Sequence, residues 1–270
     1  MATPPPVAPG PSPSTTPTAD HEHHGDHEHH GEHDHNEHAH GDHDHDHDHD
    51  KQAHAEHGHG DQAHGDHGPA HDHSAGMQHD FKGAERWAKV FDDPARDAWQ
   101  RPDEVVALMD LRPGQTVADV GAGTGYFISR LAAGVGATGQ VLATDVEDDM
   151  VRYLGERGQR EGWRNVRAVK TPPDDPKLPA GGVDRVLIVD VWHHLGDRRA
   201  YAAKLAAALR PGGAIYVVDF TMEATQGPPA KHRLPPEVIL EELRSAGLAV
   251  ELAKESLPDQ YVVVARRAAR

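Results

Sequence analysis

The sequence is most informative at Val117-Ala118-Asp119-Val120-Gly121-Ala122-Gly123-Thr124-Gly125-Tyr126-Phe127. An apolar run that contains one acidic residue leads into three glycines at alternate positions, and a second apolar run follows them. Glycine has no Cβ atom, so the backbone can turn sharply there and a ligand can lie directly against it. The pattern therefore predicts a strand, a tight turn and the start of a helix, as in nucleotide-binding α/β folds.

The spacing of these glycines restricts the ligand. A dinucleotide-binding turn has the pattern G-x-G-x-x-G, because the start of its helix receives a pyrophosphate. Here Gly125 comes one residue early, and Tyr126 occupies the position at which that pattern requires glycine. We therefore expect a nucleoside ligand without phosphates, and the sequence disfavours an NAD-dependent oxidoreductase.

Two motifs give a resemblance to a known family. Asp119, Gly121, Gly123 and Gly125 match the first motif of the class I S-adenosylmethionine-dependent methyltransferases, D-x-G-x-G-x-G. The run 209–213, Leu-Arg-Pro-Gly-Gly, resembles the L-x-P-G-G turn of that family, where its role is structural. The resemblance covers residues 100–265. It implies a Rossmann-like sheet of seven strands, mostly parallel with an antiparallel last strand, and S-adenosylmethionine as the methyl donor.

The order of apolar runs and turn residues agrees with this α/β fold. We expect an amphipathic helix and linker in residues 81–100, a helix that begins at Pro102, and further helices in residues 126–133, 147–158, 198–209 and 235–246. Strands are expected in residues 116–120, 141–144, 166–169, 183–191 and 214–220, followed by a closing pair, 248–252 and 261–265. Such alternation predicts a parallel sheet with helices on both faces.

Composition divides the chain into unlike parts. Residues 1–80 contain no Ile, Leu, Phe, Trp or Tyr, so this part cannot bury enough apolar surface to offset the entropy of ordering. We expect a Pro/Ser/Thr-rich leader in residues 1–19, a disordered His/Asp/Glu-rich tail in residues 20–80, a lid helix and linker in residues 81–101, and the methyltransferase domain in residues 102–270.

The tail carries most of the histidine and most of the charge. It holds 22 of the 25 histidines, and 17 acidic residues stand against one lysine, Lys51. Imidazole is a ligand for Zn, Ni, Cu and Co, and histidine alternates with aspartate at His43, His45, His47 and His49. The sequence predicts that the tail binds divalent metal ions, although a solvated spacer has the same composition.

The remaining residues exclude several classes of partner and site. Outside the tail the chain is nearly neutral, so it lacks the basic surface that nucleic-acid binding requires, and we expect no nucleic-acid partner. There is no cysteine, which excludes disulfides and thiolate metal sites. No apolar run approaches the roughly 20 residues of a membrane span, and the first residues lack the apolar core of a secretory signal. A cytoplasmic location is the expectation.

The resemblance implies a set of cofactor-binding residues. Asp145 ends the second strand, 20 residues after Gly125, where an acid can accept hydrogen bonds from ribose hydroxyls; the alternative is a helix cap. Asp174 follows the third strand and is the candidate for the adenine amino group; the alternative is a solvated turn. Asp190 ends the fourth strand. The full set is Asp119, Gly121, Ala122, Gly123, Gly125, Asp145, Val146, Asp174 and Asp190.

Two histidines follow the fourth strand and are the catalytic candidates. His193 or His194 can act as a general base if the methyl acceptor carries a proton; each can equally be a structural hydrogen-bonding group, and two adjacent histidines without a third ligand are weak evidence for metal. Residues 81–101 and 220–234 are the expected lid and substrate wall. Their pocket candidates, together with Trp192, are Trp87, Trp99, Phe220, Met222 and His232.

The sequence therefore predicts methyl transfer from S-adenosylmethionine to a small-molecule acceptor. No Asn-Pro-Pro-aromatic run follows the fourth strand, which disfavours methylation of nucleobases or glutamine. Transfer to O, N, C or S stays open. The alternative function is a metal buffer or metallochaperone whose domain binds the cofactor without catalysis.

Overall fold

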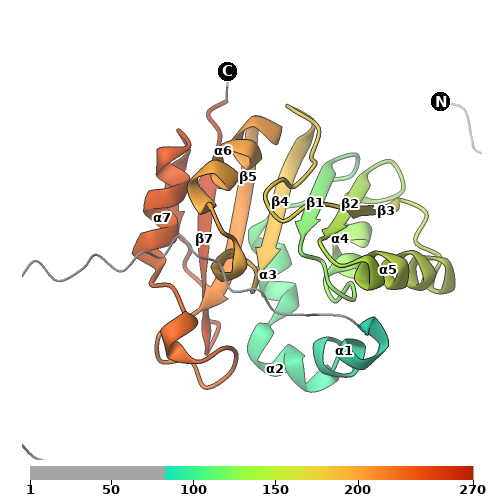
Figure 1. The fold of residues 1–270 in the computed structure, drawn as a ribbon. Coiled ribbons are helices and arrows are strands. Elements are labelled where there is room, and N and C mark those ends of the chain that lie inside the picture. The colour runs from blue at the N-terminus through green and yellow to red at the C-terminus, as the bar shows by residue number, and fades with distance from the viewer. Residues whose placement is uncertain (1–82, 270) are drawn as a thin grey trace, which may run out of the picture. The chain divides into compact units, whose positions relative to one another are not determined.

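Seven strands form one sheet in the order β3-β2-β1-β4-β5-β7-β6 (Figure 1). The structure is a computed structural model, and it describes residues 83–269. Strands β1 to β5 are parallel, whereas β7 runs antiparallel to both β5 and β6. The expected sheet is confirmed, including its antiparallel last strand. The strands are β1 (Thr116–Val120), β2 (Gln140–Asp145), β3 (Val166–Lys170), β4 (Val183–Val189), β5 (Leu209–Phe220), β6 (Ala249–Leu252) and β7 (Gln260–Arg266).

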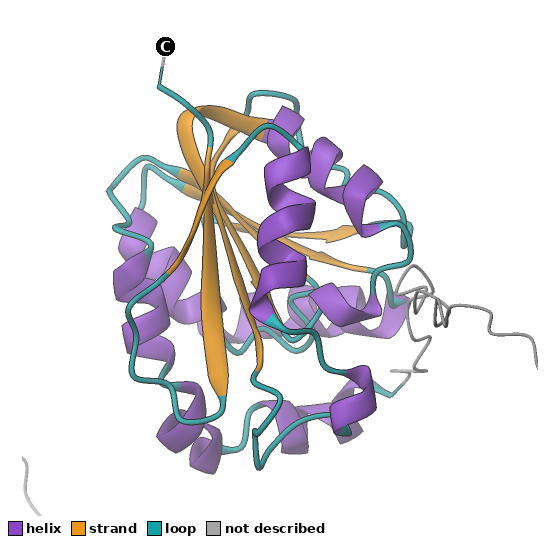
Figure 2. Ribbon diagram, turned by 90° about the vertical axis from the view of Figure 1, so that its left-hand side faces the viewer, coloured by secondary structure: helices purple, strands orange, loops and turns teal. Residues whose placement is uncertain are grey.

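Helices cover both faces of the sheet (Figure 2). Adjacent strand residues point to opposite faces, and Val117 and Ala118 accordingly belong to two different apolar clusters. The cluster of Val117 contains residues of α3 (Pro102–Leu108), α4 (Ile128–Val135) and α5 (Asp148–Glu161). The cluster of Ala118 contains residues of α6 (Arg198–Ala208) and α7 (Pro236–Ser245). The sheet therefore lies between two apolar cores, one on each face.

The lid segment, which we define as residues 83–101, lies beyond the carboxyl ends of the parallel strands (Figure 1). It contains α1 (Ala84–Phe91), a 3-10 turn (Pro94–Arg96) and α2 (Asp97–Gln100). The part expected to be a linker is therefore helical. The Asp93 carboxylate accepts a hydrogen bond from the Ala95 N–H at 2.9 Å, and a proline at the first position is preset for a helix.

Hydrogen bonds fasten the lid segment to the glycine loop, residues 121–127. The Arg157 guanidinium on α5 donates to the Thr124 carbonyl at 2.9 Å and pairs with Asp92 at 3.0 Å. Tyr126 donates its hydroxyl proton to Asp97. A Cβ atom added to Gly123 would lie 3.5 Å from the Phe91 ring. The lid segment thus packs directly on the loop that the sequence identified.

Two side chains, Arg233 and Asp259, hold the loop after β5. The Arg233 guanidinium donates to the carbonyls of Thr221, Met222 and Ala224 at 3.2, 3.1 and 2.7 Å. A second anchor is the Asp259 carboxylate, which accepts from the Thr225 N–H at 2.7 Å. This loop, the expected substrate wall, lies at the same end of the sheet as the lid segment (Figure 1).

The structural description does not extend to the leader and the tail. Residues 1–82 lie outside the described part of the chain, so the expected disorder and the metal ligands His43, His45, His47 and His49 stay predictions. Within residues 83–269, no helix combines the length and apolar character needed to cross a bilayer. The expected cytoplasmic location also stays a prediction.

Candidate active site

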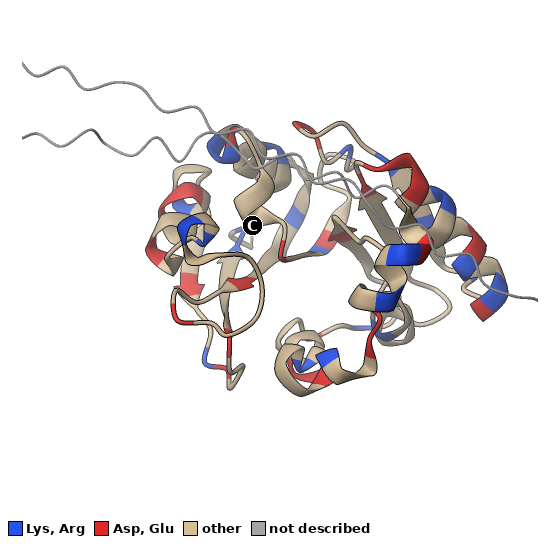
Figure 3. Cartoon of the chain, turned by 60° about the horizontal axis from the view of Figure 1, so that its bottom comes forward, with Lys and Arg blue, Asp and Glu red and all other residues tan. Residues whose placement is uncertain are grey.

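Four neighbouring strands each carry an aspartate at or near the carboxyl end. Asp145 ends β2, Asp119 lies in β1, Asp190 follows β4 directly, and Asp219 lies near the end of β5. These strands are adjacent in the sheet, so the four carboxylates form a row along one edge. Figure 3 brings this edge forward and shows acidic positions where the central strands end. Ligands of open α/β sheets bind at this edge.

The glycine loop has the backbone geometry that only glycine adopts without strain. Gly121, Gly123 and Gly125 have φ angles of 74°, 55° and 95°. The N–H groups of Gly121 and Ala122 donate to the Thr144 carbonyl at 2.8 and 2.9 Å, which ties the loop to β2. The loop also contacts the segment after β4, because a Cβ atom at Gly121 would come within 2.4 Å of Val191 Cγ2.

Asp145 links the glycine loop to the turn before α5. Its Oδ2 accepts the Gly123 N–H at 2.9 Å and its Oδ1 accepts the Glu147 N–H at 2.9 Å. Burial raises the pKa of Asp145 above its ordinary value, although both hydrogen bonds lower it. Asp145 is not the cap of α5, because Glu147 occupies that position, and each Asp145 oxygen still has a lone pair for a ligand.

Three further features lie beside Asp145. Val146 exposes 44% of its surface directly after the acid. Among the described residues, the buried hydroxyl of Thr124 has no hydrogen-bond partner. Asp119 is 4% exposed, and its pKa rises to about 7 because it is buried and faces Asp145, against the opposing charge of Arg96. A buried carboxyl group with so high a pKa lacks sufficient positive charge around it.

Asp190 joins the lid segment to the sheet. Its backbone has a φ of 58°, an unusual conformation that is often found at functional sites. Arg96 of the lid segment lies 3.5 Å from its carboxylate, and Gln260 of β7 donates to it. Burial raises the pKa of Asp190 to about 7 and Asp219 adds to the rise, whereas Arg96, His193 and Gln260 oppose it.

Arg96 is the cation that faces these carboxylates. It is 13% exposed, lies 4.2 Å from the centre of the Tyr126 ring and donates to Gln100 at 2.8 Å. Gln100 in turn donates to Gln260. A polar chain therefore runs from the lid segment to β7 across the row of aspartates.

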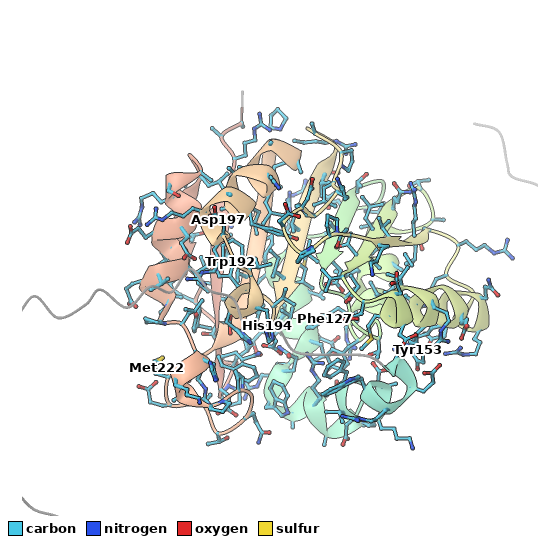
Figure 4. The ribbon with its side chains drawn as sticks, in the orientation of Figure 1. Phe127, Tyr153, Trp192, His194, Asp197 and Met222 are labelled. Atoms are coloured by element: carbon cyan, nitrogen blue, oxygen red, sulfur yellow. The ribbon has the colours of Figure 1, made fainter. Side chains whose placement is uncertain are left out.

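His193 forms a buried pair with Asp219. The Nδ1 atom of His193 lies 2.9 and 3.1 Å from the two Asp219 oxygens, and the Phe220 N–H also donates to Asp219 at 2.9 Å. The two residues are 6% and 0% exposed. The His194 ring lies 4.2 Å from that of His193, centre to centre. Figure 4 shows His194 near the carboxyl edge of the sheet, below Trp192.

The structure brings together every expected cofactor residue except one. Asp119, Gly121, Ala122, Gly123, Gly125, Asp145, Val146 and Asp190 all lie at the carboxyl ends of β1, β2 and β4. Asp174 instead lies in an exposed turn after β3, and its carboxylate is 3.8 Å from Lys204 on α6. This is the geometry of a solvated turn, and the adenine role of Asp174 stays a prediction without structural support.

The structure places Trp192, one of the pocket candidates, in the core. The residue is completely buried, and its indole N–H donates to Glu242 of α7 at 2.8 Å. Since the segment after β4 folds into a short 3-10 turn (Trp192–His194), Trp192 points into the core beneath α7. Trp99 and Phe220 contact each other at 5.9 Å between ring centres. Met222 is 41% exposed on the loop after β5 (Figure 4).

The sequence interpretation missed several polar residues of this site. Gln100 and Gln260 are almost completely buried, but nothing in their local sequence distinguishes them from surface glutamines. Arg96 lies in a segment rich in charged residues and gave no signal. Asp219 did offer one, because it is an acid near the carboxyl end of a buried strand, as are Asp145 and Asp190.

Comparisons with known proteins agree with this geometry. A family profile described as a methyltransferase domain matches residues 117–213. The ubiquinone/menaquinone biosynthesis C-methyltransferase of Shewanella halifaxensis is 30% identical over 111 residues, which are 41% of this chain and 44% of that protein. The nocamycin O-methyltransferase of Saccharothrix syringae is 35% identical over 108 residues, 40% of this chain and 39% of that protein. The chain spans less than half the length of these curated relatives.

A solved structure extends the likeness over the whole domain. The S-adenosylmethionine-dependent methyltransferase of Aquifex aeolicus is 28% identical, covers 68% of this chain and 98% of its own, and superposes with a TM-score of 0.64. Residues 117–213 therefore match a methyltransferase domain, and the described part of the chain resembles an S-adenosylmethionine-dependent methyltransferase of class I in fold and in sequence.

Proposed function

We propose that this chain transfers a methyl group from S-adenosylmethionine to a small-molecule acceptor. The observation that carries the proposal is the bond between Asp145 and the Gly123 N–H, at 2.9 Å. It holds the glycine turn and the acid together, so a nucleoside can lie on the bare backbone while its ribose hydroxyls donate to the remaining Asp145 lone pairs. The partnerless buried hydroxyl of Thr124 offers a further contact at this loop.

The charge of the site also supports this donor. S-adenosylmethionine carries a sulfonium, which makes its methyl group electrophilic, and an ammonium group. Asp119 and Asp190 have pKa values raised to about 7 with Arg96 as their opposing cation. A bound cation would lower both pKa values, because an opposite charge favours the ionised carboxylate. These residues therefore suit a positively charged ligand better than a pyrophosphate.

The acceptor is proposed to be a small molecule. The curated relatives named above are a C-methyltransferase of quinone biosynthesis and an O-methyltransferase of nocamycin. In this chain, the lid segment and the loop after β5 lie at the carboxyl edge, where they would enclose an acceptor and exclude water. Methyl transfer is an in-line displacement, and such positioning supplies much of its catalysis.

A methyl-transfer screen tests the proposal. The purified full chain is incubated with S-adenosylmethionine labelled in the methyl group and with fractionated extracts of the host. We expect label in a low-molecular-weight product, and no label with the Gly123→Val variant, because a side chain at this left-handed position would strain the turn and push against the Phe91 ring. Label found only in protein or nucleic acid would contradict the acceptor class, and absence of any product would contradict the activity.

We also propose that the tail binds divalent metal ions independently of the domain. Support comes from the sequence, in which 22 of the 25 histidines lie between His21 and His79. A chain that begins at Met77 should bind S-adenosylhomocysteine as the full chain does, while losing most of its Ni and Zn capacity. The full chain should release metal below about pH 6, because protons compete for imidazole. Unchanged metal stoichiometry after truncation would contradict this assignment.

A further inference from the structure

Asp219 is a completely buried carboxylate for which the proposed cofactor site has no use. It accepts hydrogen bonds from the Phe220 N–H at 2.9 Å and from His193 Nδ1 at 2.9 and 3.1 Å. A carboxylate can only accept, so the Nδ1 atom carries the proton and the neutral ring keeps its lone pair on Nε2. The hydrogen bonds of His193 to other described residues all pass through Nδ1. In this tautomer Nε2 is the ring atom that can accept a proton.

The position of His193 follows from the sheet. Val191, two residues earlier, lies against Gly121: a Cβ atom added to Gly121 would be only 2.4 Å from Val191 Cγ2. The strand before this segment, β4, pairs with β1 on one side and with β5 on the other. His193 thus lies between the glycine loop and Asp219, at the edge where the methyl donor is proposed to bind.

The charged groups around His193 make it a stronger base than free histidine. Burial lowers the pKa of His193, but the hydrogen bond to Asp219 and the charges of Asp219 and Asp190 outweigh this effect, so the pKa lies above its ordinary value. Arg198 on α6 acts in the opposite direction, and His194 is the adjacent ring. A base of this kind matches the proton of a weakly acidic hydroxyl near neutral pH.

We propose that His193, positioned by Asp219, is the general base for an acceptor that carries a weakly acidic hydroxyl, a phenol or an enol. The inference rests on the proposed function and names its acceptor class. The His193 Nε2 atom removes the hydroxyl proton. The oxygen electron pair forms the bond to the methyl carbon while the methyl–sulfur bond breaks and leaves its electrons on sulfur. The imidazolium then returns its proton to water.

The row of aspartates favours this class over other acceptors. A carboxylic acid is anionic before it binds, so Asp119, Asp190 and Asp219 would repel it. The same carboxylates would hold an amine in its protonated form, which has no lone pair to attack a methyl group. A neutral hydroxyl loses its proton only as His193 gains one, so the net charge of the site does not change.

Proton resonances of the full chain test the pair without any turnover. The buried Nδ1–H of His193 should give a low-field imidazole signal that is absent in H193Q and present in H194Q. In D219N the amide oxygen can still accept this hydrogen bond, but it carries no charge, so the titration midpoint of His193 should move to lower pH while the thermal midpoint of unfolding shows the variant to be folded. An unchanged midpoint in folded D219N would contradict the positioning role.

A chromogenic phenol tests the base. The full chain, saturated with S-adenosylhomocysteine, is mixed with 4-nitrophenol below the pKa of the free probe, and absorbance reports the phenolate. We expect the wild type to ionise the bound probe, H193Q to bind it neutral, and D219N to ionise it less. Methylation of the probe with S-adenosylmethionine should fall about 100-fold or more in H193Q.

The outcomes separate the two proposals. The acceptor class would be overturned if the wild type failed to bind or ionise the probe. The base assignment would be overturned if H193Q still ionised the probe, or if H194Q lost this ionisation and H193Q kept it. Calorimetry with S-adenosylhomocysteine on the same samples reports the cofactor site by itself. Normal binding there with no ionisation would overturn this inference alone, whereas absent binding would overturn the proposed function.

Discussion

At the scale of single residues, Gly121 shows how the loop and the segment after β4 depend on each other. Gly121 and Gly212 have similar φ angles, 74° and 76°, but a Cβ atom at Gly121 would lie 2.4 Å from Val191, whereas one at Gly212 would have no atom within 4 Å. Gly212→Ala should cost about 1 kcal/mol of unfolding free energy from the left-handed backbone. Gly121→Ala should cost about 1–3 kcal/mol more from the contact.

Urea denaturation measures both variants, and Val191→Ala in the Gly121→Ala background tests the cause. We expect the double variant to recover part of the loss, because the smaller side chain makes room for the added methyl group. Equal losses for the two glycines, or no recovery in the double variant, would contradict the contact.

The raised pKa values of two aspartates predict a pH dependence. Burial raises the pKa values of Asp119 and Asp190 to about 7, whereas an aspartate in the unfolded chain has a pKa near 3.9. Their stabilising contribution is therefore complete below about pH 4 and is lost as pH rises through about 7. A cation that binds beside them lowers these pKa values, so its binding should strengthen over the same upper range.

S-adenosylmethionine and S-adenosylhomocysteine isolate this effect, since only the first carries a sulfonium charge. The ratio of the Kd of S-adenosylhomocysteine to that of S-adenosylmethionine should rise between pH 6 and pH 8, by about fivefold for each carboxyl pKa that the cation lowers by one unit. Calorimetry at physiological salt gives the ratio. The double variant Asp119→Asn, Asp190→Asn keeps the histidine-rich tail and should show a flat ratio; a flat ratio in the wild type would contradict the role of these acids.

The residues of the site were predictable where the backbone requires them. Gly121, Gly123 and Gly125 followed from a turn that needs positive φ angles, and Asp145 followed from its distance to that turn. Arg96 and Gln260 did not, because their role depends on the packing of the lid segment and β7 against Asp190. Those contacts join positions 70 or more residues apart, so a local sequence pattern does not predict them.

At the scale of elements, the lid segment depends on Arg157. This side chain is 17% exposed and joins Asp92 to the glycine loop. Arg157→Ala should destabilise the lid segment by about 2 kcal/mol, because it removes the bonds of the guanidinium to Asp92 and to the Thr124 carbonyl and leaves a partly buried carboxylate without its cation. Hydrogen exchange of the α1 amides should become faster.

Arg152 provides the matched control for this prediction. It also joins the lid segment to α5, through Glu85 at 2.7 Å, but it is 43% exposed. Arg152→Ala should change the exchange of α1 by less than about 1 kcal/mol, as for other surface ion pairs. Similar effects of the two substitutions would show that the bond to the glycine loop does not hold the lid segment in place.

The element boundaries show which parts of a fold local sequence can specify. Strand β1 begins and ends where the apolar run does. Helix α5, in contrast, continues through Gly158, its expected end, to Glu161, and Gly162 ends it. The expected fourth strand was two residues too long, because Asp190 leaves the sheet with a φ of 58°. Its hydrogen bond to Gln260 and its contact with Arg96 accompany that turn, and both partners are distant in sequence.

At the scale of the whole molecule, the sheet order places the site. The crossover from β3-β2-β1 to β4-β5 puts Asp119 between Asp145 and Asp190, and insertion of β7 beside β5 brings Gln260 to the same edge. The lid segment, which precedes the sheet in the sequence, and the loop after β5 both lie at that edge (Figure 1). The alternation of strand and helix predicted a parallel sheet with helices on both faces. The strand order, and the way in which the two flanking segments close over the sheet edge, required the structure.

Calorimetric titration of the full chain with S-adenosylhomocysteine tests the central claim most directly. Chelator is added so that the tail carries no metal, and NAD is titrated for comparison. We predict one site in the wild type, no measurable binding of NAD, and at least tenfold weaker binding in Asp145→Ala, since each charged hydrogen bond lost costs about 1.5–3 kcal/mol. Absence of binding in the wild type, preference for NAD, or unchanged affinity in a folded Asp145→Ala variant would contradict the account.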